Sequence, residues 1–204
     1  HTQAGFTVGR WEGGALVVNK PELVERAAFL QEKGTDRSLV VKGFRSKYSW
    51  VDVGSSFLLS DLLAAMLLAQ LEGAEDLTAK RSRITGAYYC LFDPYQRIGG
   101  VSLPQPHPYV TINHHAFFVI FDTGTHRDQF LAGCRKLDIH SYIGYMPLHS
   151  SPMGRKFGYK PEDLPLTEAL ATRIARLPFY TGLEGAELEF CLEGMEMVLK
   201  EIYQ

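Results

Sequence analysis

YSWVDVGSSFLLSDLLAAMLLAQLE, residues 48–72, is the stretch of this chain that decides its fold. Ser60 suits a helix N-cap, and Asp61 complements the positive end of the helix dipole. The residues that follow are apolar on nearly all sides, which predicts a helix buried on more than one face. We expect the helical pattern to continue past a kink at Gly73 towards Phe92, where Asp93-Pro94 stops it.

The residues before this helix predict a short α/β segment. Glycines punctuate residues 1–19, which indicates two short strands, the second over Ala15–Val18. Pro21 then opens a helix that Gly34 closes. Residues 35–56 have no sustained period, so we expect a long loop, and its aromatic residues favour an ordered one.

The residues after it predict a smaller mixed lobe. We expect a strand over Tyr109–Phe121, a helix over His126–Leu137 and a strand near Ile139–Ile143. A helix over Pro165–Leu177 is ended by Pro178, and a last helix runs over Leu188–Ile202. The fold class is therefore α/β, with an α/β part at residues 1–98 and a small α+β domain at residues 99–204.

Composition limits the classes of partner. The formal charge of −2 and the scattered basic residues argue against nucleic acid, which normally leaves a basic stripe. The cysteines (Cys90, Cys134 and Cys191) are odd in number and widely spaced, which indicates a reducing cytoplasm rather than a disulfide framework. No stretch is long and apolar enough to insert into a membrane. Because the chain opens on His1 rather than Met, we expect the native N-terminus to lie upstream.

Six of the seven histidines lie between residues 107 and 149, and such a concentration can indicate a metal site. The spacing does not support it, because no pair stands at i,i+4 on a helix with a carboxylate nearby. His114 and His115 are adjacent and would face opposite sides of a strand. The metal prediction is therefore none.

Three groups of motifs in a fixed order resemble a known family. The first is Glu12-Gly13-Gly14-Ala15, and the second joins Lys33-Gly34-Thr35-Asp36-Arg37 to the stretch quoted above. The third holds Tyr145-Met146-Pro147-Leu148-His149, Leu164-Pro165-Leu166-Thr167-Glu168 and Leu177-Pro178-Phe179-Tyr180. Together they are similar to the second half of the DegT/DnrJ/EryC1/StrS aminotransferases. Gly54-Ser55-Ser56-Phe57-Leu58 is most similar to the dTDP-4-amino-4,6-dideoxygalactose transaminases.

The resemblance implies the C-terminal part of the large domain of a fold-type-I enzyme that uses pyridoxal phosphate, followed by a small domain. Such enzymes work as homodimers and move an amino group from glutamate to a 4-keto-6-deoxy nucleotide sugar. The product feeds bacterial surface polysaccharides such as the lipopolysaccharide O-antigen. It is a cytoplasmic activity, and neither nucleic acid nor membrane insertion is implied.

The resemblance also assigns site residues. Ser55 and Ser56 correspond to a loop that reaches the cofactor phosphate, whereas without the family they would be a turn before an N-cap. Apart from the resemblance, Arg37 and Lys33 are candidates for binding the substrate's phosphates, although exposed basic residues after a helix are more often only solvated. His115, Tyr145 and His149 fall at positions near the sugar. Relatives carry a further His where this chain has Gly144, which departs from the pattern.

The catalytic lysine of the family is missing from this chain. Ala4 stands at its position if His1 is aligned with the family's histidine, and Gly5 stands there if the alignment runs back from Glu12. Neither can form the Schiff base with the cofactor, and the first lysine is Lys20. Three explanations compete for the missing lysine. The chain is a variant, the lysine region at its start is misrecorded, or the protein is a decayed half-enzyme. No catalytic residue is therefore assigned, and the chain alone is expected to be inactive. The alternative is a non-catalytic domain that binds a sugar nucleotide or a partner chain.

Overall fold

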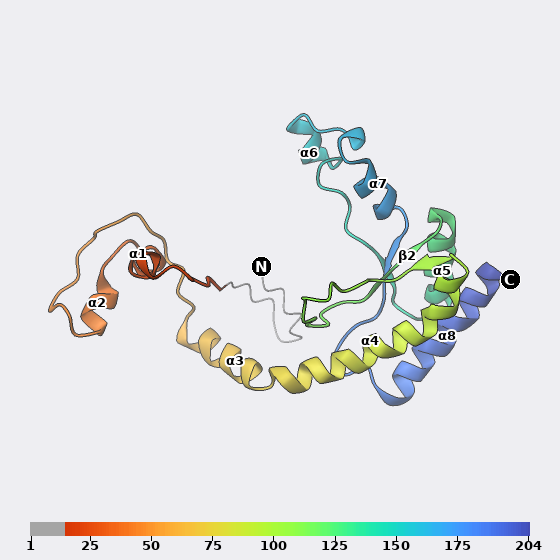
Figure 1. Cartoon of the computed structure of the whole chain (residues 1–204), viewed down its shortest axis with the longest axis horizontal. Coiled ribbons are helices and arrows are strands. Elements are labelled where there is room, and N and C mark those ends of the chain that lie inside the picture. The colour runs from red at the N-terminus through yellow and green to blue at the C-terminus, as the bar shows by residue number, and fades with distance from the viewer. Residues whose placement is uncertain (1–14) are drawn as a thin grey trace. The chain divides into compact units, whose positions relative to one another are not determined.

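The computed structural model describes residues 15–204, so Ala4, Gly5 and the first expected strand lie outside the described residues. The chain divides into two compact units, one ending at Ala74 and the other running from Glu75 to Gln204. Figure 1 labels the helices and strands of both units. None of the helices between residues 15 and 204 combines the length and apolar character needed to cross a membrane.

Three helices build the described part of the first unit: α1 (Pro21–Gln31), α2 (Arg37–Val41) and α3 (Asp61–Glu72). Pro21 lies in the first turn of α1, as predicted. The strand expected over Ala15–Val18 is wrong, since this segment is irregular. Leu16 and Val17 are 78% and 77% exposed, and within residues 15–204 no neighbouring strand supplies the hydrogen-bonded ladder that a strand requires.

The segment after α1 is ordered by backbone bridges, which agrees with the order expected of it. Glu32 bridges to Ser56, and Thr35 bridges to Trp50. The Gly34 carbonyl accepts hydrogen bonds from the Val51 and Asp52 amides at 2.8 and 3.0 Å. Gly34 has a φ of +72°, and a Cβ there would lie 1.7 Å from the Asp52 carbonyl oxygen. This crossing of two chain segments therefore requires glycine.

Helix α3 begins as predicted. The Ser60 hydroxyl caps it by accepting a hydrogen bond from the Leu63 amide at 3.4 Å. The helix ends at Glu72, and Gly73 separates it from α4, where the kink was expected. Contrary to prediction, none of its residues is buried. Among residues 15–74 most of its apolar side chains stay exposed, with Leu62, Leu68 and Leu71 at 69%, 58% and 58%.

The second unit combines four short strands with helices. In chain order its elements are α4 (Ala74–Arg97), β1 (Val101–Ser102), β2 (Phe118–Phe121), α5 (Gly124–Lys136), β3 (Tyr142–Ile143), α6 (Pro152–Lys156), the 3-10 helix η1 (Pro161–Asp163), α7 (Pro165–Ala171), β4 (Ile174–Arg176) and α8 (Gly185–Tyr203). The sheet order is β1-β2-β4-β3, and each neighbouring pair is antiparallel. The unit is thus a mixed helix and sheet structure, as the fold class predicted.

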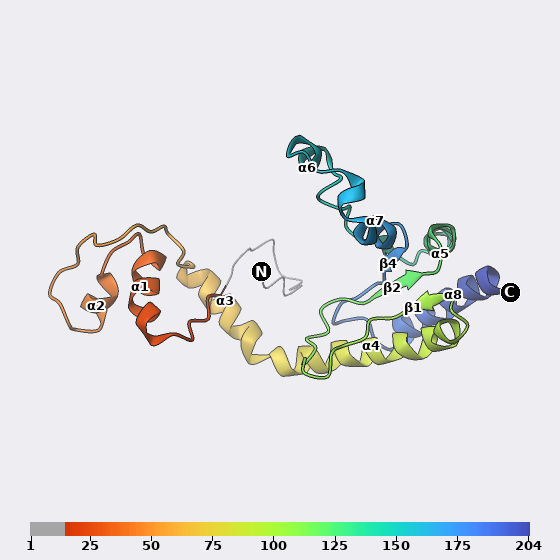
Figure 2. The ribbon, with the colours of Figure 1, turned by 45° about the horizontal axis from the view of Figure 1, so that its top comes forward.

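The hydrophobic core lies on one face of this sheet. Val119 of β2 and Ala175 of β4 are fully buried there, and α4 and α8 run side by side along that face (Figure 2). The core residues contributed by the helices are Ile84, Tyr88, Phe92, Phe130, Cys134, Cys191, Met195, Val198 and Leu199. The next residues along the strands, Phe118, Ile120, Ile174 and Arg176, are half-buried or exposed and point to the opposite face.

Several expected elements of this unit have different bounds, and three of them differ most. Helix α4 does not stop at Asp93-Pro94 but continues to Arg97, because a proline in the last turn removes only one backbone hydrogen bond. The expected strand Tyr109–Phe121 is a strand only over its last four residues. Within the expected helix Pro165–Leu177, α7 ends at Ala171 and Ile174–Arg176 pairs with β2 and β3 as a strand.

Candidate functional site

Ser55 and Ser56 lie in the bridged segment just after the Gly34 crossing. The Ser55 amide donates to the Leu30 carbonyl at 3.1 Å, and the Ser55 carbonyl accepts from the Lys33 amide at 3.0 Å. Both side chains are exposed, and neither hydroxyl has a hydrogen-bond partner among the described residues. The backbone thus holds two free hydroxyls in place, which suits contact with an anion such as a phosphate.

Arg37 stands at the start of α2 on the same unit. Its Nη1 lies 3.1 Å from Glu32 Oε1, and its side chain is 56% exposed. Such a surface ion pair contributes little to stability and leaves the guanidinium accessible. Lys33, four residues earlier in the chain, is also exposed and has a φ of +59°.

A buried acidic residue organises this unit, and the sequence did not single it out. Asp36 is only 1% exposed, accepts a hydrogen bond from the Ser49 amide at 2.6 Å and pairs with Arg45 at 2.5 Å. A second carboxylate, Asp52, pairs with Arg26 at 2.8 Å. The hydrogen bond from Arg26, followed by that from the Val53 amide, lowers the pKa of Asp52. Both acids secure the loop that carries the two serines.

Of the residues predicted near the sugar, His149 is 7% exposed and lies before α6. Its Nε2 is 3.1 Å from Glu168 Oε1 on α7. The distance is that of an ion pair, but the two atoms are not aligned for a hydrogen bond, and neither has another partner among residues 15–204. The histidine therefore ties the segment after β3 to α7.

Tyr145 follows β3 directly and is 76% exposed. The guanidinium carbon of Arg176, at the end of β4, lies 5.2 Å from the centre of its ring, which is a cation–π contact. Gly144 allows the chain to pass close to β4 just before Tyr145, since a Cβ at residue 144 would lie 2.4 Å from Ile174 Cγ2. The departure from the family pattern at residue 144 thus coincides with a close approach of backbone to β4.

His115 lies in the loop between β1 and β2. It is exposed, and its amide and Nδ1 contact the Asn113 side-chain oxygen at 3.3 and 3.2 Å. The structure therefore brings Tyr145 together with Arg176 and His149 together with Glu168, and it leaves His115 in a separate loop. Arg37, Ser55 and Ser56 belong to the first unit.

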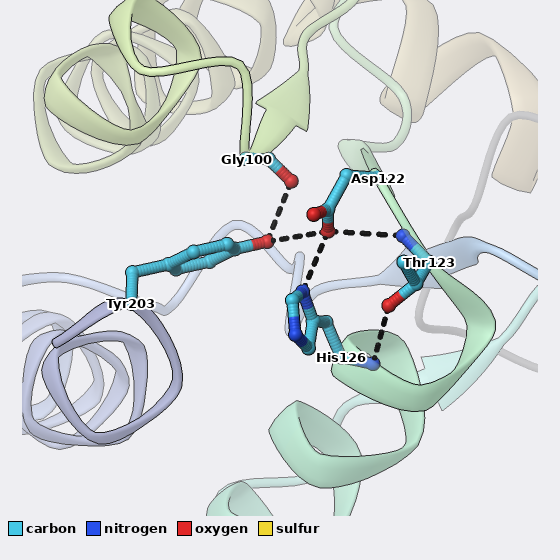
Figure 3. Close-up of polar contacts among 5 residues, drawn as sticks. All are labelled: Gly100, Asp122, Thr123, His126 and Tyr203. Atoms are coloured by element: carbon cyan, nitrogen blue, oxygen red, sulfur yellow. Dashed lines mark hydrogen bonds and ion pairs between the residues drawn. The ribbon is translucent and has the colours of Figure 1, made fainter.

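The densest polar cluster of the second unit was not predicted (Figure 3). Asp122 Oδ1 lies 2.7 Å from His126 Nδ1 and accepts hydrogen bonds from the Thr123 amide at 2.9 Å and the Tyr203 hydroxyl at 3.0 Å. The same hydroxyl donates to the Gly100 carbonyl at 2.5 Å. No sequence motif marks this cluster, because its members are separated by as many as 103 residues.

The contacts within this cluster favour an ionised Asp122 and a protonated Tyr203. Partial burial raises the pKa of Asp122, but hydrogen bonds from His126 and Tyr203 outweigh it and lower the pKa below its ordinary value. Burial, followed by the hydrogen bond to Asp122, raises the pKa of Tyr203. An ionised carboxylate thus accepts from a protonated phenol. The cluster ties the end of α8 to the start of α5 and to the residue before β1.

A groove of about 690 Å³ lies elsewhere, between α4 and α8. It shares no residue with the predicted site. Its lining is mostly apolar, with Glu193, Glu196 and Lys200 at its rim. No group of three potential metal ligands occurs within residues 15–204.

The comparisons with known proteins give the family. The model of the DegT/DnrJ/EryC1/StrS aminotransferase family matches residues 3–196. This chain belongs to the DegT/DnrJ/EryC1/StrS aminotransferase family. The match covers nearly the whole chain, so the resemblance carried by the three groups of motifs is confirmed.

Individual relatives are distant. GDP-perosamine synthase of Caulobacter vibrioides is 27% identical over 192 residues, which are 92% of this chain and 48% of that protein. The dTDP-4-dehydro-2,3,6-trideoxy-D-glucose 4-aminotransferase of Saccharopolyspora spinosa is 26% identical over 183 residues, 87% of this chain and 46% of that protein. The chain spans about half the length of the curated relatives it matches.

The fold is that of solved sugar aminotransferases. The structure of the putative sugar aminotransferase Spr1654 from Streptococcus pneumoniae, in its PMP form, matches with a TM-score of 0.73 at 19% identity. The match covers 93% of this chain and 48% of that one. At this identity the likeness concerns the fold, and it confirms the predicted α/β class.

Proposed function

We propose that this chain is part of a pyridoxal-phosphate-dependent aminotransferase that transfers an amino group from glutamate to a dTDP-linked 4-keto-6-deoxy sugar. The observation that carries the proposal is the family match over residues 3–196. The sugar-nucleotide class is supported by two relatives whose names specify a GDP-linked and a dTDP-linked sugar. The choice of dTDP rests on the Ser55-Ser56-Phe57-Leu58 motif.

The wider setting belongs to the same proposal. Residues 1–98 would end the cofactor-binding large domain, and residues 99–204 would form the small domain. A homodimer in the cytoplasm would supply amino sugars for surface polysaccharide such as O-antigen. Three free cysteines among the described residues agree with a reducing compartment.

The cofactor fits the described residues only in part. Ser55 and Ser56 would hold its phosphate, since their exposed hydroxyls are free and their backbone is held by Leu30 and Lys33. When bound, pyridoxal phosphate acts as the electron sink for chemistry at the amine-bearing carbon. Covalent attachment does not fit, because Ala4 and Gly5 stand at the lysine's position. This chain alone is therefore expected not to transfer amino groups.

The substrate would be bound by Arg37, His115, Tyr145 and His149. Arg37 offers an accessible guanidinium for phosphate, and the exposed Tyr145 and His115 offer polar and ring contacts to a sugar. His149 would act mainly by positioning, because it is buried against Glu168 while Tyr145 is exposed four residues earlier.

A second candidate function is a non-catalytic domain that binds a sugar nucleotide or a partner chain. The specific observation in its favour is the absence of lysine at both aligned positions, Ala4 and Gly5. An amine nucleophile is required for covalent catalysis with this cofactor.

An experiment on the native protein separates the two. An antibody raised against this chain would isolate its natural form, whose intact mass is measured before and after borohydride reduction. The proposal expects a polypeptide about twice as long, in keeping with relatives that this chain half covers. It also expects one pyridoxal phosphate fixed by reduction and glutamate-dependent amination of a dTDP-4-keto sugar. A native product of 204 residues without cofactor would favour the binding domain.

The isolated chain gives a complementary measurement. Supplied with pyridoxal phosphate, glutamate and a dTDP-4-keto sugar, it is expected to form no amino sugar while still binding dTDP. Turnover by this chain would refute the assignment of Ala4 or Gly5 to the lysine position.

A further inference from the structure

The strands of the second unit leave one face of the sheet open around Arg176. In the register of the sheet, Arg176 of β4 stands between Phe118 of β2 and Tyr142 of β3. Because side chains alternate along strands, these three belong to the face opposite the buried Val119 and Ala175. Arg176 is exposed, Tyr142 is 60% exposed and Phe118 is half-buried. The row is a cation between two aromatic residues.

Tyr145 supports this cation from a third side. Its ring centre lies 5.2 Å from the guanidinium carbon, and the contact occupies a π face without using the N–H donors. No carboxylate among residues 15–204 pairs with Arg176, whereas Arg26, Arg37, Arg45 and Arg97 each have one. Arg176 therefore keeps its fork of donors free for a ligand.

The position of Tyr145 is fixed by the residues around it. Before it, Ile143 pairs with Ala175, and Gly144 lies so close to Ile174 that a Cβ at residue 144 would be 2.4 Å from Ile174 Cγ2. After it, His149 is buried against Glu168. The ring is thus held over β4 from both ends of a short segment, so the cation and its support are preorganised rather than brought together by chance.

We propose that Arg176, seated on Tyr145, is an oxyanion-binding residue and that it takes the diphosphate of a nucleotide. The guanidinium fork matches two phosphate oxygens, and the flanking Phe118 and Tyr142 rings give flat surfaces for the attached groups. The nucleotide assignment rests on the proposed function, whereas the oxyanion site rests on the geometry alone. Asp138 precedes β3 in the chain, but its Oδ1 lies 3.4 Å from His140 Nε2 and it makes no ion pair with Arg176.

The test is the binding of inorganic pyrophosphate, dTDP and glutamate to the whole chain, measured by titration calorimetry. Arg176→Gln is expected to weaken pyrophosphate and dTDP by roughly tenfold or more, the usual loss for a charge-assisted contact. Arg176→Lys keeps the charge but not the fork, so an intermediate loss is expected. Tyr145→Leu removes the ring and should weaken pyrophosphate binding roughly two- to fivefold, whereas Tyr145→Phe keeps the ring and should weaken it less.

Arg135→Gln is the matched control, because Arg135 is also exposed and lies on the last turn of α5. It makes the same change of charge and should bind within about twofold of the wild type. Protection of the buried Cys134 thiol verifies that each variant is folded.

The outcomes separate this site from the proposed function. Equal binding by the wild type and Arg176→Gln, or no binding of either phosphate ligand to the wild type, overturns the inference. Arg176-dependent binding of glutamate alone overturns the phosphate assignment. Arg176-dependent binding of pyrophosphate without binding of dTDP supports the oxyanion site and contradicts the nucleotide-sugar part of the proposed function.

Discussion

Tyr203 carries the most consequential single hydroxyl of the second unit. It lies near the end of α8, and its single O–H proton is shared between the Gly100 carbonyl oxygen at 2.5 Å and Asp122 Oδ1 at 3.0 Å. Tyr203→Phe keeps the ring and removes both hydrogen bonds. We expect the free energy of unfolding of this unit to fall by about 1–2 kcal/mol, because the buried part of the site loses its donor.

The measurement uses the two buried thiols, Cys134 and Cys191, which both report on the core of this unit. Their alkylation is followed by mass spectrometry across a urea gradient. Tyr95→Phe is the matched control, since its ring lies 5.7 Å from that of Tyr203 and its hydroxyl has no hydrogen bond within residues 15–204. A shift of the Tyr203→Phe midpoint no larger than that of the control would contradict the role of the cluster.

The three thiols should react very differently with an alkylating reagent. Cys90 is exposed, whereas Cys134 and Cys191 are buried. Burial raises the pKa of Cys134 to about 12 and raises that of Cys191. Because the thiolate is the reactive form, raised pKa values suppress reaction at neutral pH.

We expect one thiol to react rapidly in the native chain at about pH 8 and all three to react after denaturation. Peptide mapping should place the fast label on Cys90. Raising the pH should increase labelling of Cys134 only as the pH approaches the value of about 12. Rapid labelling of Cys134 at neutral pH would show that the core of α5 and α8 is open in solution.

At the scale of elements, the crossing at Gly34 decides the arrangement of the first unit. Gly34→Ala adds a Cβ 1.7 Å from the Asp52 carbonyl oxygen at a φ of +72°. The two segments must separate, which removes the Gly34 contacts to Val51 and Asp52 and disturbs the segment that carries Ser55 and Ser56. We expect amide protection of Val51 and Asp52 in hydrogen exchange to be lost.

Gly43→Ala is the control for this change. Gly43 also has a positive φ, +78°, but a Cβ there meets nothing within 4 Å. Its substitution should cost only the conformational penalty of about 1 kcal/mol and leave the two amides protected. Retained protection in Gly34→Ala would mean that the crossing tolerates a side chain.

Some of the helices could be predicted from the sequence, and some of the strands could not. Helices with clear caps and long periodic faces were predicted well: Ser60 begins α3, and the pattern from Leu188 to Ile202 lies within α8. The errors fall where tertiary pairing overrides local pattern. Ile174–Arg176 continues an apparently helical stretch but becomes a strand because β2 and β3 flank it.

The candidate site divides in the same way. Ser55 and Tyr145 could be named as candidates from the sequence because they lie in motifs that resemble the family. Their partners could not. Glu168 beside His149 and Arg176 beside Tyr145 are 19 and 31 residues away along the chain, and they meet only because α7 and β4 return to the end of β3. Asp122 and Tyr203 are likewise united by folding alone.

At the scale of the whole chain, the exposed apolar surface of the first unit predicts association. None of the residues of α1, α2 or α3 is buried. Several of its large apolar side chains are 52% to 79% exposed, and they include Phe44, Trp50, Phe57, Leu58, Leu62, Leu68 and Leu71. Monomeric soluble proteins rarely leave many large apolar side chains of one region exposed to water.

We expect the purified chain to form concentration-dependent assemblies larger than its 22.9 kDa monomer in light scattering after size-exclusion chromatography. Leu68 and Leu71 stand three residues apart on one face of α3, and both are 58% exposed. The double substitution Leu68→Lys and Leu71→Lys should therefore shift the distribution towards the monomer. Leu166→Lys, which changes a residue on α7 that is 69% exposed, controls for the added charge and should leave the assemblies intact. A wild-type chain that stays monodisperse and monomeric at high concentration would show that this apolar surface needs no partner.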